Sequence, residues 1–126
     1  MALNKSEIKY SGEYLASQAN GEMSREVVTL LTNATVYQPG DVLARIAATG
    51  KYTYVNTAAN DGSETAVAIN YARQDATSAD VSNAPVTARD AEVNQAELNF
   101  GTSDGPTIAN IVSDLASRNI ICRTGV

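Results

Sequence analysis

The sequence predicts a β-rich α+β fold, a small antiparallel β domain with one or two short helices and an extended N-terminal arm. Three observations lead to this fold class. Short apolar, β-branched segments alternate with turns that contain Gly, Pro or Asn. One segment near the C-terminus carries apolar side chains at helical spacing. Residues 1–20 include aromatic and aliphatic side chains but no repeating apolar face, so no regular element is expected there, and the β-rich domain is expected over residues 21–126.

The expected strands follow one another closely after the arm. Pro39 presets φ and Gly40 accepts a positive φ, so the turn that contains them fits type II. Thr49 and Gly50 fit a tight hairpin between two strands. Strand character is found in residues 26–31, 35–37, 42–47, 51–55, 65–71, 85–88 and 120–123, and longer polar loops are expected in residues 56–65 and 73–84.

The clearest helix is expected after Pro106. Asp104 can cap it, and a proline in the first helical turn loses no hydrogen bond. Asn119 can take the left-handed conformation that ends a helix. The segment 90–98 is compatible with a second, shorter helix, with Asp90 as its N-cap. The apolar stripe of the main helix comprises Ile108, Ile111, Val112, Leu115 and Ala116.

Length, charge and hydropathy narrow the class of protein. A chain of 126 residues is close to the common size of one domain. Its net charge of −5, its pI of about 4.5 and its scattered basic residues disfavour binding to phosphate backbones, so no nucleic-acid partner is expected. No apolar run approaches the ~20 residues that cross a bilayer, and the N-terminus has no secretory signal. We therefore expect a soluble protein, made in the cytoplasm, with no membrane partner.

The absence of histidine limits the possible chemistry. Histidine is the usual general base near neutral pH and the commonest metal ligand. Without it, Ser-His-Asp catalysis, Cys-His catalysis and histidine-based zinc sites are excluded. The single cysteine, Cys122, lies in an apolar segment and is expected to be a buried, inert thiol. We therefore expect no enzyme, no catalytic or metal-binding residues, no cofactor and no small-molecule substrate, although carboxylate, lysine or tyrosine chemistry stays open.

Taken together, several segments resemble the head decoration protein D family of tailed phages, the lambda type. The patterns ANGEMSRE before the first strand and RDAEVN after a later one are fairly specific when both occur. The matching segments appear in family order and are LASQANGEMSREVVTL (15–30), QPGDVLARI (38–46), TGKYTYVNTAANDGSETAVAINY (49–71), VTARDAEVNQAEL (86–98) and IANIVSDLASRNIICR (108–123).

The resemblance implies a capsid-stabilising protein of the virion. Family members form homotrimers on the outside of the expanded head, at three-fold and quasi-three-fold positions. There they bind the major capsid (coat) protein and hold neighbouring coat subunits together against the pressure of packaged DNA. They add no chemistry. The acidic composition agrees with an exterior location, because an acidic protein is repelled by DNA.

The resemblance also implies that residues 1–20 form a capsid-binding arm, which adds extended backbone to a loop of the coat protein. In β-addition, main-chain hydrogen bonds give affinity and alternate side chains give specificity. Tyrosine suits such contacts because it buries a large area at low entropic cost. The alternative that this segment packs on its own domain stays open. The expected anchors of the arm are Ile8, Tyr10, Tyr14 and Leu15.

A β-rich surface binding module, which recognises a receptor or a glycan, is the alternative function. Exposed aromatic side chains on a β face would support it, and Tyr52, Tyr54 and Tyr71 are the candidates. Alternation along the strands makes half-burial of these rings equally expected. An enzyme that uses carboxylates is a third interpretation, which requires a pocket with acidic groups of raised pKa.

Overall fold

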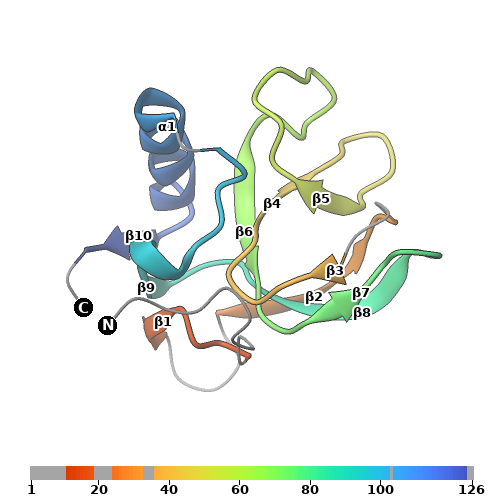
Figure 1. The fold of residues 1–126 in the computed structure, drawn as a ribbon, viewed down its shortest axis with the longest axis horizontal. Helices are drawn as coiled ribbons and strands as arrows, with labels where there is room; N and C mark the ends of the chain where they lie inside the picture. The colour runs from red at the N-terminus through yellow and green to blue at the C-terminus, as the bar shows by residue number, and fades with distance from the viewer. Residues whose placement is uncertain (1–10, 19–23, 33–35, 103, 125–126) are drawn as a thin grey trace.

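The computed structural model describes residues 11–18, 24–32, 36–102 and 104–124. In them the chain forms ten strands, one α-helix and one 3₁₀ turn (Figure 1), which confirms the prediction of a β-rich domain with a short helix. Neither of these helical segments is long and apolar enough to span a membrane. The elements are β1 (Leu15–Gln18), β2 (Arg25–Leu30), β3 (Val36–Tyr37), β4 (Val42–Arg45), β5 (Tyr52–Tyr54), β6 (Ala66–Asn70), β7 (Gln74–Asp75), β8 (Val81–Thr87), β9 (Ala91–Asn94), η1 (Gln95–Glu97), α1 (Gly105–Ala116) and β10 (Ile120–Arg123).

Five strands close into a small barrel in the order β2-β5-β4-β6-β8. Neighbouring strands are antiparallel except at the seam between β2 and β5, where the parallel pairing is limited to Leu30 and Tyr52. One further hydrogen bond, from Leu31 N to Tyr52 O at 2.8 Å, supports this seam. The core cluster that draws mainly on the barrel strands contains Leu30, Tyr37, Leu43, Ala68, Ala76, Ala84, Val86 and Ala88.

A three-stranded sheet, β1-β9-β10, lies beside the barrel. Its central strand, β9, pairs with β1 in antiparallel and with β10 in parallel orientation. Helix α1 packs against β10 and against β6 of the barrel, so it joins the two sheets (Figure 1). Strands β3 and β7 form a separate pair. The core cluster beneath the helix contains Tyr14, Val42, Ala66, Ile69, Val93, Ile111, Leu115 and Ile120.

The ends of helix α1 follow the local signals in its sequence. The Asp104 carboxylate accepts a hydrogen bond from Thr107 N at 3.1 Å, and Pro106 lies in the first turn. Asn119 has a φ of 60°, the left-handed conformation expected just after the helix. The helix buries Ile111 and Leu115 of the predicted stripe.

The turn before β4 also matches its prediction. Gly40 has a φ of 95°, and Asp41 N donates to Gln38 O at 3.1 Å, as a type II turn requires. A Cβ atom at Gly40 would lie 2.6 Å from the Glu97 carbonyl oxygen. This position therefore requires glycine for two reasons, the backbone conformation and the close approach of a second segment.

The prediction of a helix over residues 90–98 is wrong. This segment forms strand β9 followed by the 3₁₀ turn η1. Ala91 and Val93 are buried and alternate with partly exposed neighbours, which is the pattern of a strand. Asp90 has a φ of 51° and does not cap a helix, whereas the Asn94 side chain caps η1.

The antiparallel prediction is incomplete, because the β2–β5 and β9–β10 pairs are parallel. Two further strands were not predicted. Residues 15–18 form β1, although the sequence there has no regular pattern, and the expected loop 73–84 contains β7 and the start of β8. These pairings join segments that are distant in the sequence, so no local pattern predicts them.

Candidate functional site

The structure describes two of the four predicted arm anchors, Tyr14 and Leu15. Ile8 and Tyr10 lie outside the described residues. Tyr14 is fully buried, and its hydroxyl shares a hydrogen bond with Thr87 Oγ1 at 2.5 Å. Burial raises the pKa of the Tyr14 phenol, and the bond to Thr87 partly opposes that shift. Leu15 is partly buried and packs against the same core cluster as Tyr14.

The backbone around Tyr14 is also held by the folded body. Asn94 N donates to Tyr14 O at 2.7 Å, and Leu15 N donates to Gly12 O at 3.0 Å in a tight turn. Strand β1 then pairs with β9. The side chains of Tyr14 and Leu15 therefore face the protein's own core in this structure, and residues 11–18 pack on their own domain.

A compact group near the first described residues consists of Gly12, Tyr71 and Arg25. Gly12 N donates to Tyr71 O at 3.0 Å, and a Cβ atom at Gly12 would lie 2.8 Å from Cε1 of the Tyr71 ring. The Arg25 guanidinium lies 4.4 Å from the centre of that ring. The sequence analysis did not identify Gly12 or Arg25, and only the folded chain brings the three together.

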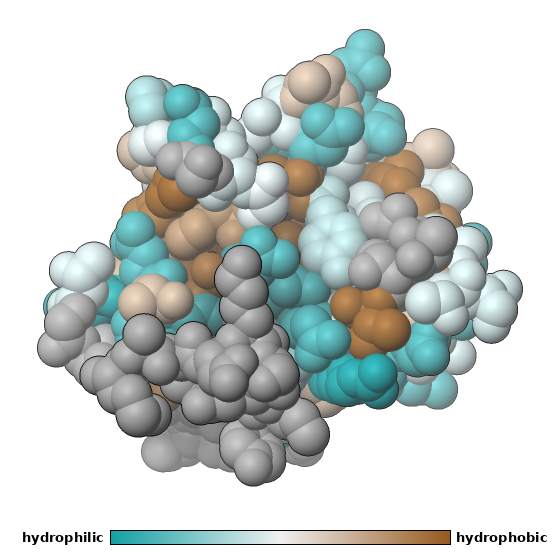
Figure 2. Space-filling view, viewed as in Figure 1, coloured by the Kyte–Doolittle hydropathy of each residue, from teal (hydrophilic) through white to brown (hydrophobic). Residues whose placement is uncertain are grey.

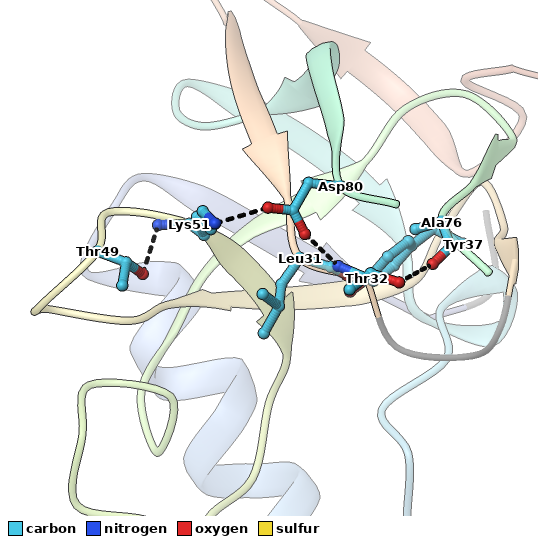
Figure 3. Close-up of polar contacts among 7 residues, drawn as sticks. All are labelled: Leu31, Thr32, Tyr37, Thr49, Lys51, Ala76 and Asp80. Carbon is cyan, nitrogen blue, oxygen red and sulfur yellow. Dashed lines mark hydrogen bonds and ion pairs between the residues drawn. The ribbon is translucent and has the colours of Figure 1, made fainter. Parts of the chain in front are cut away.

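A polar network joins three loops at the β2–β5 seam of the barrel (Figure 3). Lys51 Nζ lies 2.6 Å from one Asp80 oxygen, and Thr32 N donates to the other at 2.8 Å. Thr32 Oγ1 also donates to Ala76 O at 2.6 Å, and Tyr37 OH donates to Leu31 O at 2.7 Å. The network holds the β4–β5 turn and the β7–β8 loop against the end of β2. Its contacts stabilise the barrel at this seam.

The described acidic residues do not form a reactive cluster. In the described part of the chain, no three Cys, Asp or Glu side chains lie close enough together to hold a metal ion. Asp41 is buried, but Gln38 N, the Tyr54 hydroxyl and the Asn99 amide donate to its carboxylate. The carboxyl groups with a resolved shift have a pKa lowered mainly by a side-chain hydrogen bond, and they are Asp61, Asp75, Asp80 and Asp104.

Cys122 lies in β10 and is partly buried beside the core cluster. Burial raises the pKa of its thiol to about 11. The group is therefore almost entirely protonated near neutral pH, and a protonated thiol is a poor nucleophile.

The tyrosines considered for a surface binding module are half-buried. Tyr54 stacks on Tyr37, with ring centres 4.7 Å apart, and its hydroxyl donates to Asp41. Tyr71 lies between Gly12 and Arg25. These rings have contacts within the domain, so they do not form an exposed aromatic platform.

A hollow of about 180 Å³ lies between the loop after β5 and the start of α1. The space-filling view shows hydrophobic residues at the base of the notch between α1 and that loop (Figure 2). Its lining consists mostly of small polar side chains and backbone, with no cluster of charged groups. The lining residues are Val55, Asn56, Thr57, Phe100, Gly101, Thr102, Thr107 and Ile111.

A known protein family matches most of this chain. The family model described as bacteriophage lambda head decoration protein D matches residues 4–120, which is most of the chain. Searches of curated proteins and of solved structures gave no significant match. The match begins before the described residues, runs through the barrel and helix α1, and ends at the first residue of β10. The chain belongs to the bacteriophage lambda head decoration protein D family.

Proposed function

We propose that this phage head decoration protein binds as a homotrimer to the outside of the expanded head, at three-fold and quasi-three-fold sites, and stabilises the head against internal DNA pressure. Its partner would be the major capsid protein, and it would reach the virion surface after synthesis in the host cytoplasm. The observation that carries the proposal is the family match over residues 4–120. Membership of a structural capsid family also favours a role without catalysis.

The charge of the protein supports an exterior role. A net charge of −5 disfavours contact with packaged DNA and does not hinder contact between proteins. The closed barrel supports a mechanical role, because a closed sheet has no free edges and its strands support one another.

The proposal assigns capsid binding to the N-terminal arm, predicted over residues 1–20, with Ile8 and Tyr10 as its side-chain anchors. Tyr14 and Leu15 would fix the base of the arm, because both pack on the folded body. Residues 1–10 in extended form span at most about 35 Å, which is enough to reach a neighbouring coat subunit. Three arms on one trimer would act together and raise the overall affinity by ~10²–10⁴-fold.

Sedimentation tests this function directly. Purified full-length protein is centrifuged alone and after mixing with expanded, undecorated heads of the parent phage. We expect a trimer in solution that pellets with the heads and saturates at a fixed ratio to coat protein. Decorated heads should also resist heat or chelator treatment longer than undecorated heads. A protein that stays in the supernatant at all head concentrations would refute the proposal.

A further inference from the structure

Strand β2 exposes an apolar surface that the fold does not use. Val27 is 65% exposed and is the one large hydrophobic residue exposed in the described part of the chain. It lies opposite Pro85 in the β2–β8 pairing. Together with Arg25 and Glu26, these residues line a shallow depression of about 200 Å³, which we name the β2–β8 patch. An apolar centre with a polar rim is the usual composition of a protein contact site.

Arg25 adds a positive charge to this patch. Its guanidinium lies on the Tyr71 ring, and none of the ion pairs among the described residues includes it. A guanidinium that has no carboxylate partner in its own chain can pair with an acceptor from a partner protein. Since Arg25 is a cation, a carboxylate is the acceptor that it binds best.

The patch is continuous with the base of the N-terminal arm. Tyr71 N donates to Pro85 O at 3.2 Å, and Tyr71 O accepts from Gly12 N at 3.0 Å. The same Tyr71 ring carries Arg25. Gly12 is therefore bonded to Tyr71, and Tyr71 is bonded to the patch. A partner bound to the arm would for this reason lie near the patch.

We propose that the β2–β8 patch is a second contact with the coat protein, formed with the same subunit that binds the arm. It would take an extended coat segment with an acidic side chain for Arg25 and an apolar side chain for Val27 and Pro85. This inference rests on the proposed capsid-binding function. The position of the patch beside the arm favours the coat protein, because the arm raises the local concentration of that partner there.

The test compares two full-length variants that add the same charge. Val27→Asp places a carboxylate in the patch, where it repels an acidic partner segment and removes the apolar contact. Ala109→Asp adds a carboxylate to the exposed face of α1 and is the matched control. Analytical ultracentrifugation gives the oligomeric state, and sedimentation with expanded, undecorated heads gives the affinity. We expect both variants to form trimers, and Val27→Asp to bind heads about ten-fold or more weakly than wild type and Ala109→Asp.

Each other result overturns a specific claim. If wild-type protein does not bind heads, the proposed function fails. If wild type and Val27→Asp bind heads equally, the patch is not a coat contact, although the proposed function stands. A Val27→Asp chain that folds but does not form trimers would assign the patch to a contact between copies of this chain. Tighter binding by Val27→Asp would show that the patch holds the protein's own N-terminal segment.

Arg25→Gln provides a second variant that does not depend on tolerance of Asp at position 27. Gln keeps a polar side chain of similar length but lacks the positive charge. We expect weaker head binding and, above all, a smaller loss of affinity between low and high salt than wild type shows. An unchanged salt dependence would contradict the acidic partner segment.

Discussion

Tyr14 shows how one buried residue can define the base of a segment. Its ring fills the core beneath α1, and its hydroxyl meets the Thr87 hydroxyl on β8. We expect Tyr14→Phe to lower the free energy of unfolding by about 1 kcal/mol, because it leaves Thr87 without this partner. Tyr14→Ala should cost about 3–5 kcal/mol, because it opens a cavity. Urea denaturation measures both values.

Tyr52→Phe is the control for this prediction. Tyr52 is half-buried on β5, and removal of its hydroxyl should change the free energy of unfolding by less than about 0.5 kcal/mol. If Tyr14→Ala unfolds at the wild-type urea concentration, Tyr14 is not part of the core, and its assignment to the base of the arm is wrong.

Cys122 gives the protein a predictable response to alkaline pH. Its thiol has a pKa raised to about 11 by burial, so the folded state favours the protonated form. The resulting stabilisation is fully present below the pKa of an unfolded thiol, which is about 8.5. It is lost as the pH rises through about 11. We therefore expect wild type to lose stability between pH 8 and pH 11 more steeply than Cys122→Ala in parallel thermal melts.

At the scale of elements, the β2–β5 seam is where the barrel depends most on side chains. Its backbone pairing is limited to Leu30, Leu31 and Tyr52, and the Lys51–Asp80–Thr32 network lies beside it (Figure 3). Asp80→Ala removes both contacts of that carboxylate. We expect it to lower the melting temperature and to speed hydrogen exchange of the Leu31 amide, which reports opening of the seam.

Lys51→Met is the matched variant, because it removes the ion pair and leaves the bond from Thr32 N to Asp80. It should have a smaller effect than Asp80→Ala. The Lys51 hydrogen bond, followed by that of Thr32 N, lowers the pKa of Asp80. Its stabilisation is present above about pH 4, the ordinary pKa, and is lost as the pH falls through the lowered value. The difference in stability between wild type and Asp80→Ala should therefore be smaller at pH 2 than at pH 7. An equal difference at both pH values would contradict this account.

The elements that the sequence predicted well are those whose signals are local. Asp104, Pro106 and Asn119 act within one turn of helix α1, and Gly40 acts within its own turn. Strand β9 was missed although Ala91 and Val93 alternate correctly, because Glu and Gln nearby are strong helix formers. Tertiary pairing with β1 and β10 decides the conformation of this segment.

The candidate site was predicted only in part for the same reason. The arm was expected from the family resemblance, but the burial of Tyr14 depends on Thr87, which is far away in the sequence. The β2–β8 patch requires Val27 and Pro85 to lie opposite each other and Arg25 to reach Tyr71. Composition and spacing give no sign of such contacts, which only the closed barrel creates.

At the scale of the whole molecule, the division between arm and body can be tested by deletion. An arm that ends at residue 20 predicts that a chain without residues 2–20 still folds. The structure leads us to expect the opposite, since that deletion removes β1 and Tyr14 from the core. A chain without residues 2–10 should instead fold and form trimers, and it should lose ~10²-fold or more in affinity for expanded heads.

Thermal melts, analytical ultracentrifugation and sedimentation with heads separate these outcomes. If the chain without residues 2–10 binds heads normally, the arm does not contribute to head binding. A melting temperature close to that of wild type for the chain without residues 2–20 would instead place the boundary after β1.

The three-stranded sheet also determines how the chain could be circularly permuted. Leu15 and Cys122 both pair with Val93, on opposite sides of β9, so the start of β1 and the end of β10 lie two strand spacings apart, about 10 Å. A bridge of about four residues that ends with Tyr14 spans that distance and keeps this side chain in the core. A circular permutant with this bridge and with new termini in the loop around Asp61 would keep every strand pairing. This permutant would have no free segment ahead of β1. If it folds but does not bind the capsid, the N-terminal segment serves attachment and not folding.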